Sequence, residues 1–255
     1  MGAPTGGQLS TPAFAAAVCA AAAMLTCVPA QAAPDWIHGI FASHLGGRAR
    51  AASVARYAME SGGGFILDTS SGKALLKFQD GFEVWALTVS RGPRGDLIYW
   101  NDIRQPLLRA TRMGGVTVFT PRRPEGDAAT ATGPGAPLRI STIGLQVLYQ
   151  RLLQAAARSS HAAAHTIVYE ARDDHLGDYG VMADAALVAS EAIVFIASRP
   201  SGRAQLSRLS KVRILLGKDA AGTLKEGVLT VTVAPARDAF GRPSSLRIAQ
   251  VLEGH

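Results

Sequence analysis

Short apolar runs recur between residues 53 and 120, and turn residues separate them every eight to twelve positions. The Asp80-Gly81 step between two of these runs is typical of a β-hairpin, because glycine adopts the positive φ that tight hairpin turns need. The pattern predicts an antiparallel β-meander of six or seven strands that could curl toward a barrel. Residues 50–60 fit either a first strand or a short helix. The apolar runs are 65–67, 74–78, 82–89, 97–100, 106–108 and 116–119.

Residues 121–137 are rich in Pro, Gly, Ala and Thr and have no period, which predicts a linker or a long surface loop. A helical period follows. The apolar residues that recur every three or four positions are Leu145, Leu148, Tyr149, Leu152, Leu153 and Ala156, so an amphipathic helix is expected there.

The rest of the chain mixes helices and strands. Residues 166–170 resemble a strand, and 181–197 form an apolar segment in which only Asp184 and Glu191 are charged. Two acids favour a buried core helix over a membrane span, and charges at the rim of such a helix are expected more than a catalytic carboxylate pair. Residues 211–216 and 228–234 predict a hairpin, and a last helix begins near Pro243. The predicted fold class is therefore α+β, with an N-terminal meander and a helix-rich second half.

The first 34 residues contain no Asp, Glu, Lys or Arg. An apolar run too short to span a bilayer comfortably ends at a proline and an Ala30-x-Ala32 motif, which predicts a signal peptide cleaved after Ala32. The Lys or Arg with which a signal peptide normally starts is missing. A buried Ala-rich helix is the alternative interpretation of this segment. A lipid anchor on Cys19 or Cys27 is disfavoured because Val18 and Thr26 replace the small residue that usually precedes such a cysteine.

The expected organisation is a signal peptide at 1–32, a meander domain at 33–120, a linker at 121–137 and an α+β domain at 138–255. Both cysteines, Cys19 and Cys27, lie in the removed segment. The mature chain would then have no disulfide, thiol nucleophile or cysteine metal ligand. The predicted location is the periplasm or the exterior of the cell, and the mature chain is expected to have no transmembrane helix.

A set of short motifs is spread over residues 50–253. They are FILD at 65–68, ALLKF at 74–78, EVWAL at 83–87, GPRGDLIY at 92–99, LLRATRMGG at 107–115 and GRPSS at 241–245. Together they resemble an uncharacterised, exported family of Gram-negative bacteria with a domain of unknown function. The resemblance implies export and a shared fold, and it implies no catalytic or binding residue.

Two motifs carry candidate chemistry. His161 and His165 stand four positions apart, which places two imidazoles on one helix face where they could hold a transition metal. No Glu follows His161 in the manner of helical zinc proteases, so a solvated face is favoured and no cofactor is expected. Ser70 and Lys73 match the Ser-x-x-Lys spacing of penicillin-recognising enzymes, but the serine falls in a turn rather than at a helix start.

The formal charge is +7, with 26 basic and 19 acidic residues. Tyr99, Trp100, Arg104, Arg109 and Arg112 would give the meander a basic, partly aromatic surface that suits anionic lipid headgroups, acidic glycans or nucleic acid. The charge is spread evenly along the chain, and a protein that depends on phosphate contacts usually concentrates it. Nucleic acid is therefore the least favoured of these partners.

A predicted signal peptide without a coherent catalytic set favours a non-catalytic protein of the cell envelope. Its partner would be another envelope protein, a glycan or a small ligand. Two alternatives remain open at this point: an exported hydrolase whose site is assembled only in the fold, and a carrier for a small apolar ligand if the strands enclose a cavity.

Overall fold

A computed structural model describes residue 2, residues 53–172 and residues 177–254. Residues Arg50–His255 form one compact unit. The predicted signal peptide, its cleavage site and most of the segment before residue 53 lie outside the described residues.

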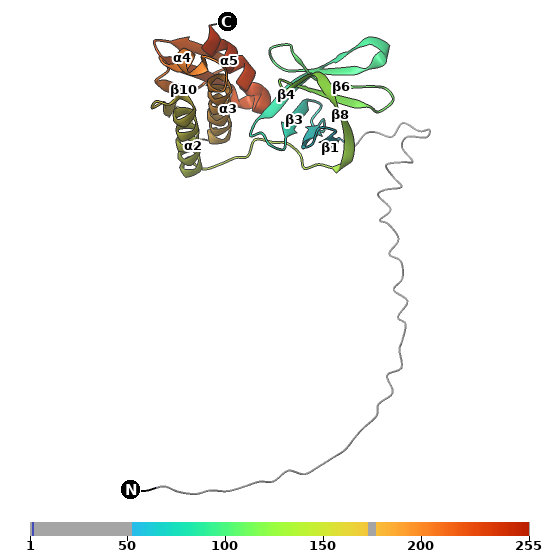
Figure 1. Ribbon diagram of the computed structural model, residues 1–255, viewed down its shortest axis with the longest axis horizontal. Coiled ribbons are helices and arrows are strands. Elements are labelled where there is room, and N and C mark those ends of the chain that lie inside the picture. Colours follow the sequence, from blue (N-terminus) through green and yellow to red (C-terminus); the bar gives the residue numbers. More distant parts are fainter. Residues whose placement is uncertain (1, 3–52, 173–176, 255) are drawn as a thin grey trace. The chain divides into compact units, whose positions relative to one another are not determined.

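Eight antiparallel strands form a closed barrel in the order of the sequence (Figure 1). The prediction of an antiparallel meander that could curl toward a barrel is confirmed, although it has eight strands rather than six or seven. Residues 54–59 form a strand rather than a helix. The strands are β1 (Val54–Met59), β2 (Gly64–Asp68), β3 (Ala74–Phe78), β4 (Val84–Arg91), β5 (Leu97–Trp100), β6 (Pro106–Ala110), β7 (Val116–Thr120) and β8 (Arg123–Pro134).

Strand β8 closes the barrel by pairing with both β7 and β1. The prediction of a linker or loop over 121–137 is therefore wrong for residues 123–134. This strand has few large apolar side chains, and only Asp127 is buried along it. Its place is fixed by backbone pairing on both sides and by the Asp127 carboxylate, which accepts hydrogen bonds from the Ser61 hydroxyl and amide. Its two prolines lie near its ends, where a missing amide costs least.

Side chains fill the inside of the barrel. The Tyr57 and Phe65 rings stack with centroids 4.9 Å apart, and Phe78 meets Phe65 edge-on at 6.1 Å. The outer face of β2–β4 is buried as well, against Leu138 and the short helix η2 (Pro235–Gly241). The buried residues of the interior are Phe65, Leu67, Ala74, Leu76, Leu87, Tyr99, Leu107, Leu108, Val116 and Val118.

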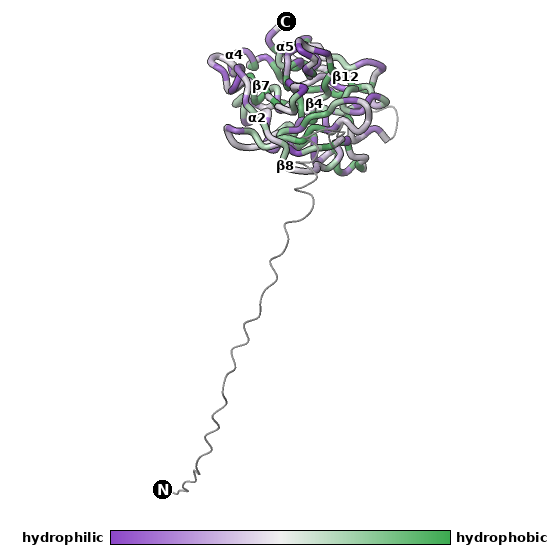
Figure 2. Tube along the Cα trace, turned by 90° about the vertical axis from the view of Figure 1, so that its right-hand side faces the viewer, coloured by the Kyte–Doolittle hydropathy of each residue, from purple (hydrophilic) through white to green (hydrophobic). Residues whose placement is uncertain are grey.

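The second half packs helices on a four-stranded sheet of order β11-β12-β10-β9. The strands are β9 (Val168–Arg172), β10 (Lys211–Leu216), β11 (Ala221–Lys225) and β12 (Val228–Val233), and the helices are α2 (Leu145–Ala163), α3 (Tyr179–Ala197), α4 (Gly202–Leu206) and α5 (Ser245–Glu253). The predicted α+β class is confirmed. In Figure 2 hydrophilic residues mark the turns and the α4 region, whereas β4 is hydrophobic.

One strand relation in this half differs from the prediction. Strands β10 and β12 are parallel neighbours, so the predicted hairpin between them is wrong. The actual hairpin joins β11 and β12 through Glu226 and Gly227, which both have positive φ. Strand β11 carries mostly exposed residues, so its sequence has no apolar period from which a strand could be predicted.

Helix α3 is the core helix of this half. Eleven of its nineteen residues are buried, against the sheet, α2 and α5. Among the described residues it is also the one helix that is long and apolar enough to cross a membrane. Most of that apolar surface lies inside the protein.

The loop before α5 folds tightly on itself at Gly241. A Cβ built on Gly241 would lie 2.0 Å from the carbonyl oxygen of Ala234, whose own amide donates to the Gly241 carbonyl oxygen. No side chain fits at this position without a backbone shift, and the loop sets the direction in which Arg242 and α5 leave.

We expect Gly241→Ala to lower the free energy of unfolding by about 2 kcal/mol or more, because the added methyl group meets backbone rather than a movable side chain. Gly81→Ala is the matched control, since Gly81 does not have the positive φ expected from the sequence and its Cβ would make only ordinary contacts at 3.6 Å or more. Urea unfolding curves measure both changes. Equal stabilities of the two variants would contradict this account of the loop.

Candidate functional site

Successive turns of an antiparallel barrel lie at alternate ends. The β4–β5 turn (residues 92–96) and the β6–β7 turn (residues 111–115) therefore lie at one end. The β3–β4, β5–β6 and β7–β8 turns lie at the other. This arrangement separates the arginines that the sequence grouped: Arg109 and Arg112 lie at the first end and Arg104 at the second.

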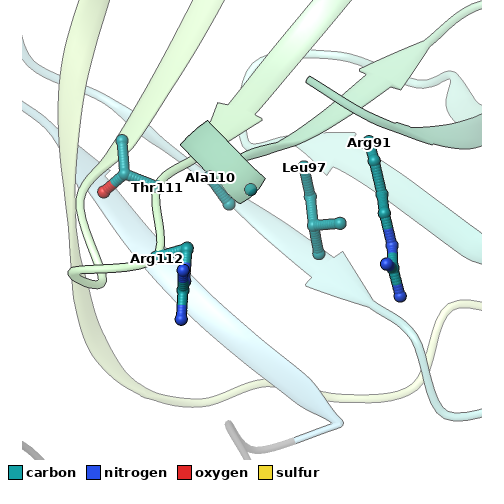
Figure 3. A pocket seen from close by; sticks show the side chains of 6 residues that line it. Arg91, Leu97, Ala110, Thr111 and Arg112 are labelled. Atoms are coloured by element: carbon teal, nitrogen blue, oxygen red, sulfur yellow. The ribbon is translucent and has the colours of Figure 1, made fainter. Parts of the chain in front are cut away.

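The turns 92–96 and 111–115, together with Arg91, Leu97, Arg109 and Ala110 at the adjoining strand ends, form what we call the basic end. An open groove of about 460 Å³ lies there. Figure 3 shows Leu97 between Arg91 and Arg112, so an apolar floor has a guanidinium group on either side. The residues that line the groove are Arg91, Gly95, Leu97, Ala110, Thr111 and Arg112.

Local packing holds the arginines of the basic end in place. Arg112 lies across Gly95, where an added Cβ would be 2.7 Å from the Arg112 Cδ. Gly95 also has a φ of +80°, so this position favours glycine for two reasons. Arg109 donates from Nε to the buried carboxylate of Asp96 at 2.8 Å.

Three further arginines at this end, Arg91, Arg94 and Arg112, form no ion pair within the part of the chain that the structure describes. Exposed apolar side chains accompany them. Met113 at the tip of the β6–β7 turn is 90% exposed, Val89 48% and Leu97 38%. Arg109 and Arg112 were identified from the sequence, whereas Arg91, Arg94 and Met113 were missed. The rule of alternating turns could have found them.

The remaining residues of the predicted surface lie elsewhere. Tyr99 is 6% exposed inside the barrel, so the prediction that it belongs to a contact surface is wrong. The alternation along β5 turns Tyr99 inward, where it pairs with Leu108 on the next strand. Trp100 donates to the Ser90 hydroxyl at 2.8 Å and lines a second groove of about 370 Å³ with Thr88 and Arg104.

The prediction that His161 and His165 share one helix face is wrong, because α2 ends at Ala163 and His165 lies beyond its left-handed cap residue Ala164. His161 is exposed, whereas the ring nitrogens of His165 lie 3.2 Å from the Ala163 carbonyl oxygen and 2.7 Å from that of Leu209. Both nitrogens of His165 are thus engaged by backbone oxygens. Among the described residues no group of three His, Cys, Asp or Glu side chains could hold a metal ion. His175, which follows these residues in sequence, lies outside the described residues.

A buried ionic cluster joins the barrel to α5. Arg242 donates from Nη1 to Glu83 at 3.2 Å, from Nη2 to the Val84 carbonyl oxygen at 2.8 Å, and from Nε to Asp184. The Ser245 hydroxyl and amide donate to the Glu83 carboxylate at 2.5 and 3.1 Å. Arg242 and Glu83 are almost completely buried.

This cluster contains two carboxylates and one cation. Burial is the main cause that raises the pKa of Glu83 to about 7, and the nearby Asp184 adds to the rise. Arg242 and the hydrogen bonds from Ser245 oppose it. Protonation of Glu83 would cancel the excess negative charge of the cluster, which agrees with the direction of the shift.

The same cluster contains a serine bound to a carboxylate at a helix N-terminus, an arrangement that nucleophilic catalysis uses. Ser245 is 6% exposed and Glu83 3%, and neither of the two grooves described above includes them. The pair is therefore shielded from solvent in the observed conformation.

Ser70 of the Ser-x-x-Lys match lies in the β2–β3 turn. Its hydroxyl donates to the Asp68 carboxylate at 2.6 Å rather than to the amine of Lys73. Asp68 also accepts from the Leu138 amide at 2.7 Å. Burial raises the pKa of Asp68. The hydrogen bonds from Ser70 and Leu138 and the charge of Arg139 together lower it by more than burial raises it, so the pKa of Asp68 is below its ordinary value. Asp68 thus anchors the segment that leaves the barrel.

Comparison with known proteins places most of the chain in one protein family. Residues 41–252 match the DUF4908 family, which is described as a domain of unknown function, and the chain belongs to this family. No curated protein and no solved structure matches the chain.

We expect the stability of the protein to fall as pH rises from about 4.5 to 7. In this window the folded protein retains the Glu83 proton, whereas the unfolded chain, with an ordinary pKa near 4.5, releases it. The expected fall in the free energy of unfolding is about 2 to 4 kcal/mol, and Glu83→Gln should remove it.

The measurement is a set of urea unfolding curves between pH 4 and 8 for the wild type, Glu83→Gln and the exposed control Glu125→Gln. Groups that do not interact with Glu83 contribute equally to the wild type and to Glu83→Gln, so the difference between these two profiles reports the proton of the Glu83 cluster. Parallel stability profiles for the wild type and Glu83→Gln would disprove the assignment.

Proposed function

We propose that this protein is exported and acts in the cell envelope as a non-catalytic binding protein that engages an anionic partner through the basic end of its barrel. The observation that carries the proposal is the gathering of Arg91, Arg94 and Arg112 beside exposed Leu97 and Met113. Guanidinium groups that form no ion pair with the described residues, placed around an apolar groove, favour a ligand surface that is both anionic and partly apolar.

The alternatives have less support. A hydrolase would need its nucleophile in an accessible cleft, and the Ser245–Glu83 pair is buried. A carrier would need a cavity in the barrel, where aromatic and aliphatic side chains are packed instead. The basic end, by contrast, is open and lies away from the buried junction with α5.

Export predicts a shortened protein that starts at Ala33 and separates with the periplasmic or secreted fraction. Fractionation of cells followed by N-terminal sequencing measures both properties. Recovery of the full-length chain with cytosolic markers would disprove the export part of the proposal and leave the binding part to be tested by itself.

Charge reversal at the basic end should abolish binding to envelope material. We expect Arg91→Glu with Arg112→Glu to prevent co-sedimentation with an isolated envelope fraction. The matched control is Arg104→Glu with Arg122→Glu, which changes the net charge equally at the opposite end of the barrel and should preserve binding.

Both pairs replace exposed residues, so their urea midpoints should match that of the wild type. Equal loss of binding in the two double variants would show that only net charge matters. No binding by the wild type would also overturn the proposed site.

A further inference from the structure

We infer that the anionic partner is a phospholipid bilayer surface, on which the protein rests with the tips of the β4–β5 and β6–β7 turns. This inference depends on the proposed function and names the partner of the same site. It follows from the basic and apolar side chains of the basic end, from their positions in the two turns, and from the absence of aromatic residues in 91–97 and 109–115.

The two turns place charge and apolar surface where a bilayer would meet both at once. Met113 projects at the tip of one turn with 90% of its surface exposed, and Gly114 and Gly115 follow it without side chains that could hold it away from a flat surface. Arg112 precedes it, and Arg94 occupies the tip of the other turn. Proteins that bind membrane surfaces combine apolar residues that enter the interface with basic residues that meet anionic headgroups.

The groove suits the chemistry of a headgroup. Guanidinium groups recognise phosphate oxygens by paired hydrogen bonds, and Arg91 and Arg112 lie on either side of the apolar Leu97 (Figure 3). A phosphodiester can be held between the arginines while the carbon atoms next to it cover Leu97. The position of Arg112 is supported by its contact with Gly95, so part of this arrangement exists before binding.

Other anionic polymers fit this end less well. Glycans and single-stranded nucleic acids are commonly held by exposed aromatic rings, and residues 91–97 and 109–115 include none. The aromatic residues of β5 do not line the groove of the basic end: Tyr99 is buried in the barrel, and Trp100 lines the groove of Arg104. An exposed methionine gains little from a hydrated polysaccharide, whereas it gains from burial in a bilayer interface.

The test uses the purified protein in the form recovered by fractionation, with vesicles of phosphatidylcholine alone and vesicles that contain about 30 mol% phosphatidylglycerol. We expect sedimentation with the anionic vesicles only, and weaker binding as salt rises. Because one arginine near an anionic surface contributes about fivefold to partitioning, Arg91→Glu with Arg112→Glu should lower it at least about 25-fold. The control pair, Arg104→Glu with Arg122→Glu, should bind more strongly than this variant by about the same factor.

Two variants of the tip separate insertion from simple charge attraction. Met113→Ser keeps the charge and should lower partitioning about three- to tenfold. The chain has three native tryptophans. Met113→Trp adds a further fluorophore at the tip, and the difference in emission between this variant and the wild type should shift to shorter wavelength only when anionic vesicles are present. An unshifted emission in the vesicle-bound state would overturn the inference that this tip meets the bilayer.

The failure of this inference can be distinguished from the failure of the proposed function. Binding to delipidated envelope material that depends on Arg91 and Arg112, without binding to vesicles, would overturn the lipid partner and retain the anionic site. Vesicle binding that is unaffected by both arginine pairs would overturn the basic end as the membrane contact. Loss of binding to vesicles and envelope material alike would overturn both.

Discussion

The guanidinium group of Arg242 is the contact on which the arrangement of the two halves depends. It donates to a carboxylate and a backbone carbonyl oxygen of the barrel and to a carboxylate of α3. A buried cation of this kind is favourable only when all its partners are present, because each missing partner leaves an uncompensated charge or polar group. The barrel and the helical half therefore complete each other, and without α5 the Glu83 carboxylate would lose both hydrogen bonds from Ser245.

The basic end is free of this constraint. Antiparallel topology places the turns that carry Arg94 and Met113 at the end opposite to the turns that contact α5. Substitutions at the basic end can change its surface charge while the packed interior and the buried junction remain the same. This separation explains how one small protein can combine a fully satisfied ionic cluster with arginines that keep no ion pair among the described residues.

Sequence reasoning predicted the meander, helices α2 and α3 and the start of α5, because each has a strong local period or a clear turn or cap signal. It missed β8 and β11, whose side chains are mostly small or exposed and whose places come from backbone pairing with distant strands. The contact between Glu83 and Arg242 joins residues 159 positions apart and has no local signal. At the candidate site two of the arginines were identified, but assigning them to the two ends of the barrel required the strand order. The burial of Tyr99 could be recognised only once the inward-facing residues of β5 were known.

The closing strand β8 gives the barrel a seam that differs from its other strand pairs. It contributes hydrogen bonds to β1 and β7 but only one buried residue, Asp127. A strand that buries so little apolar surface is held mainly by its backbone hydrogen bonds, so closure of the barrel depends on the pairing of β8 with β1 and β7 rather than on side-chain packing.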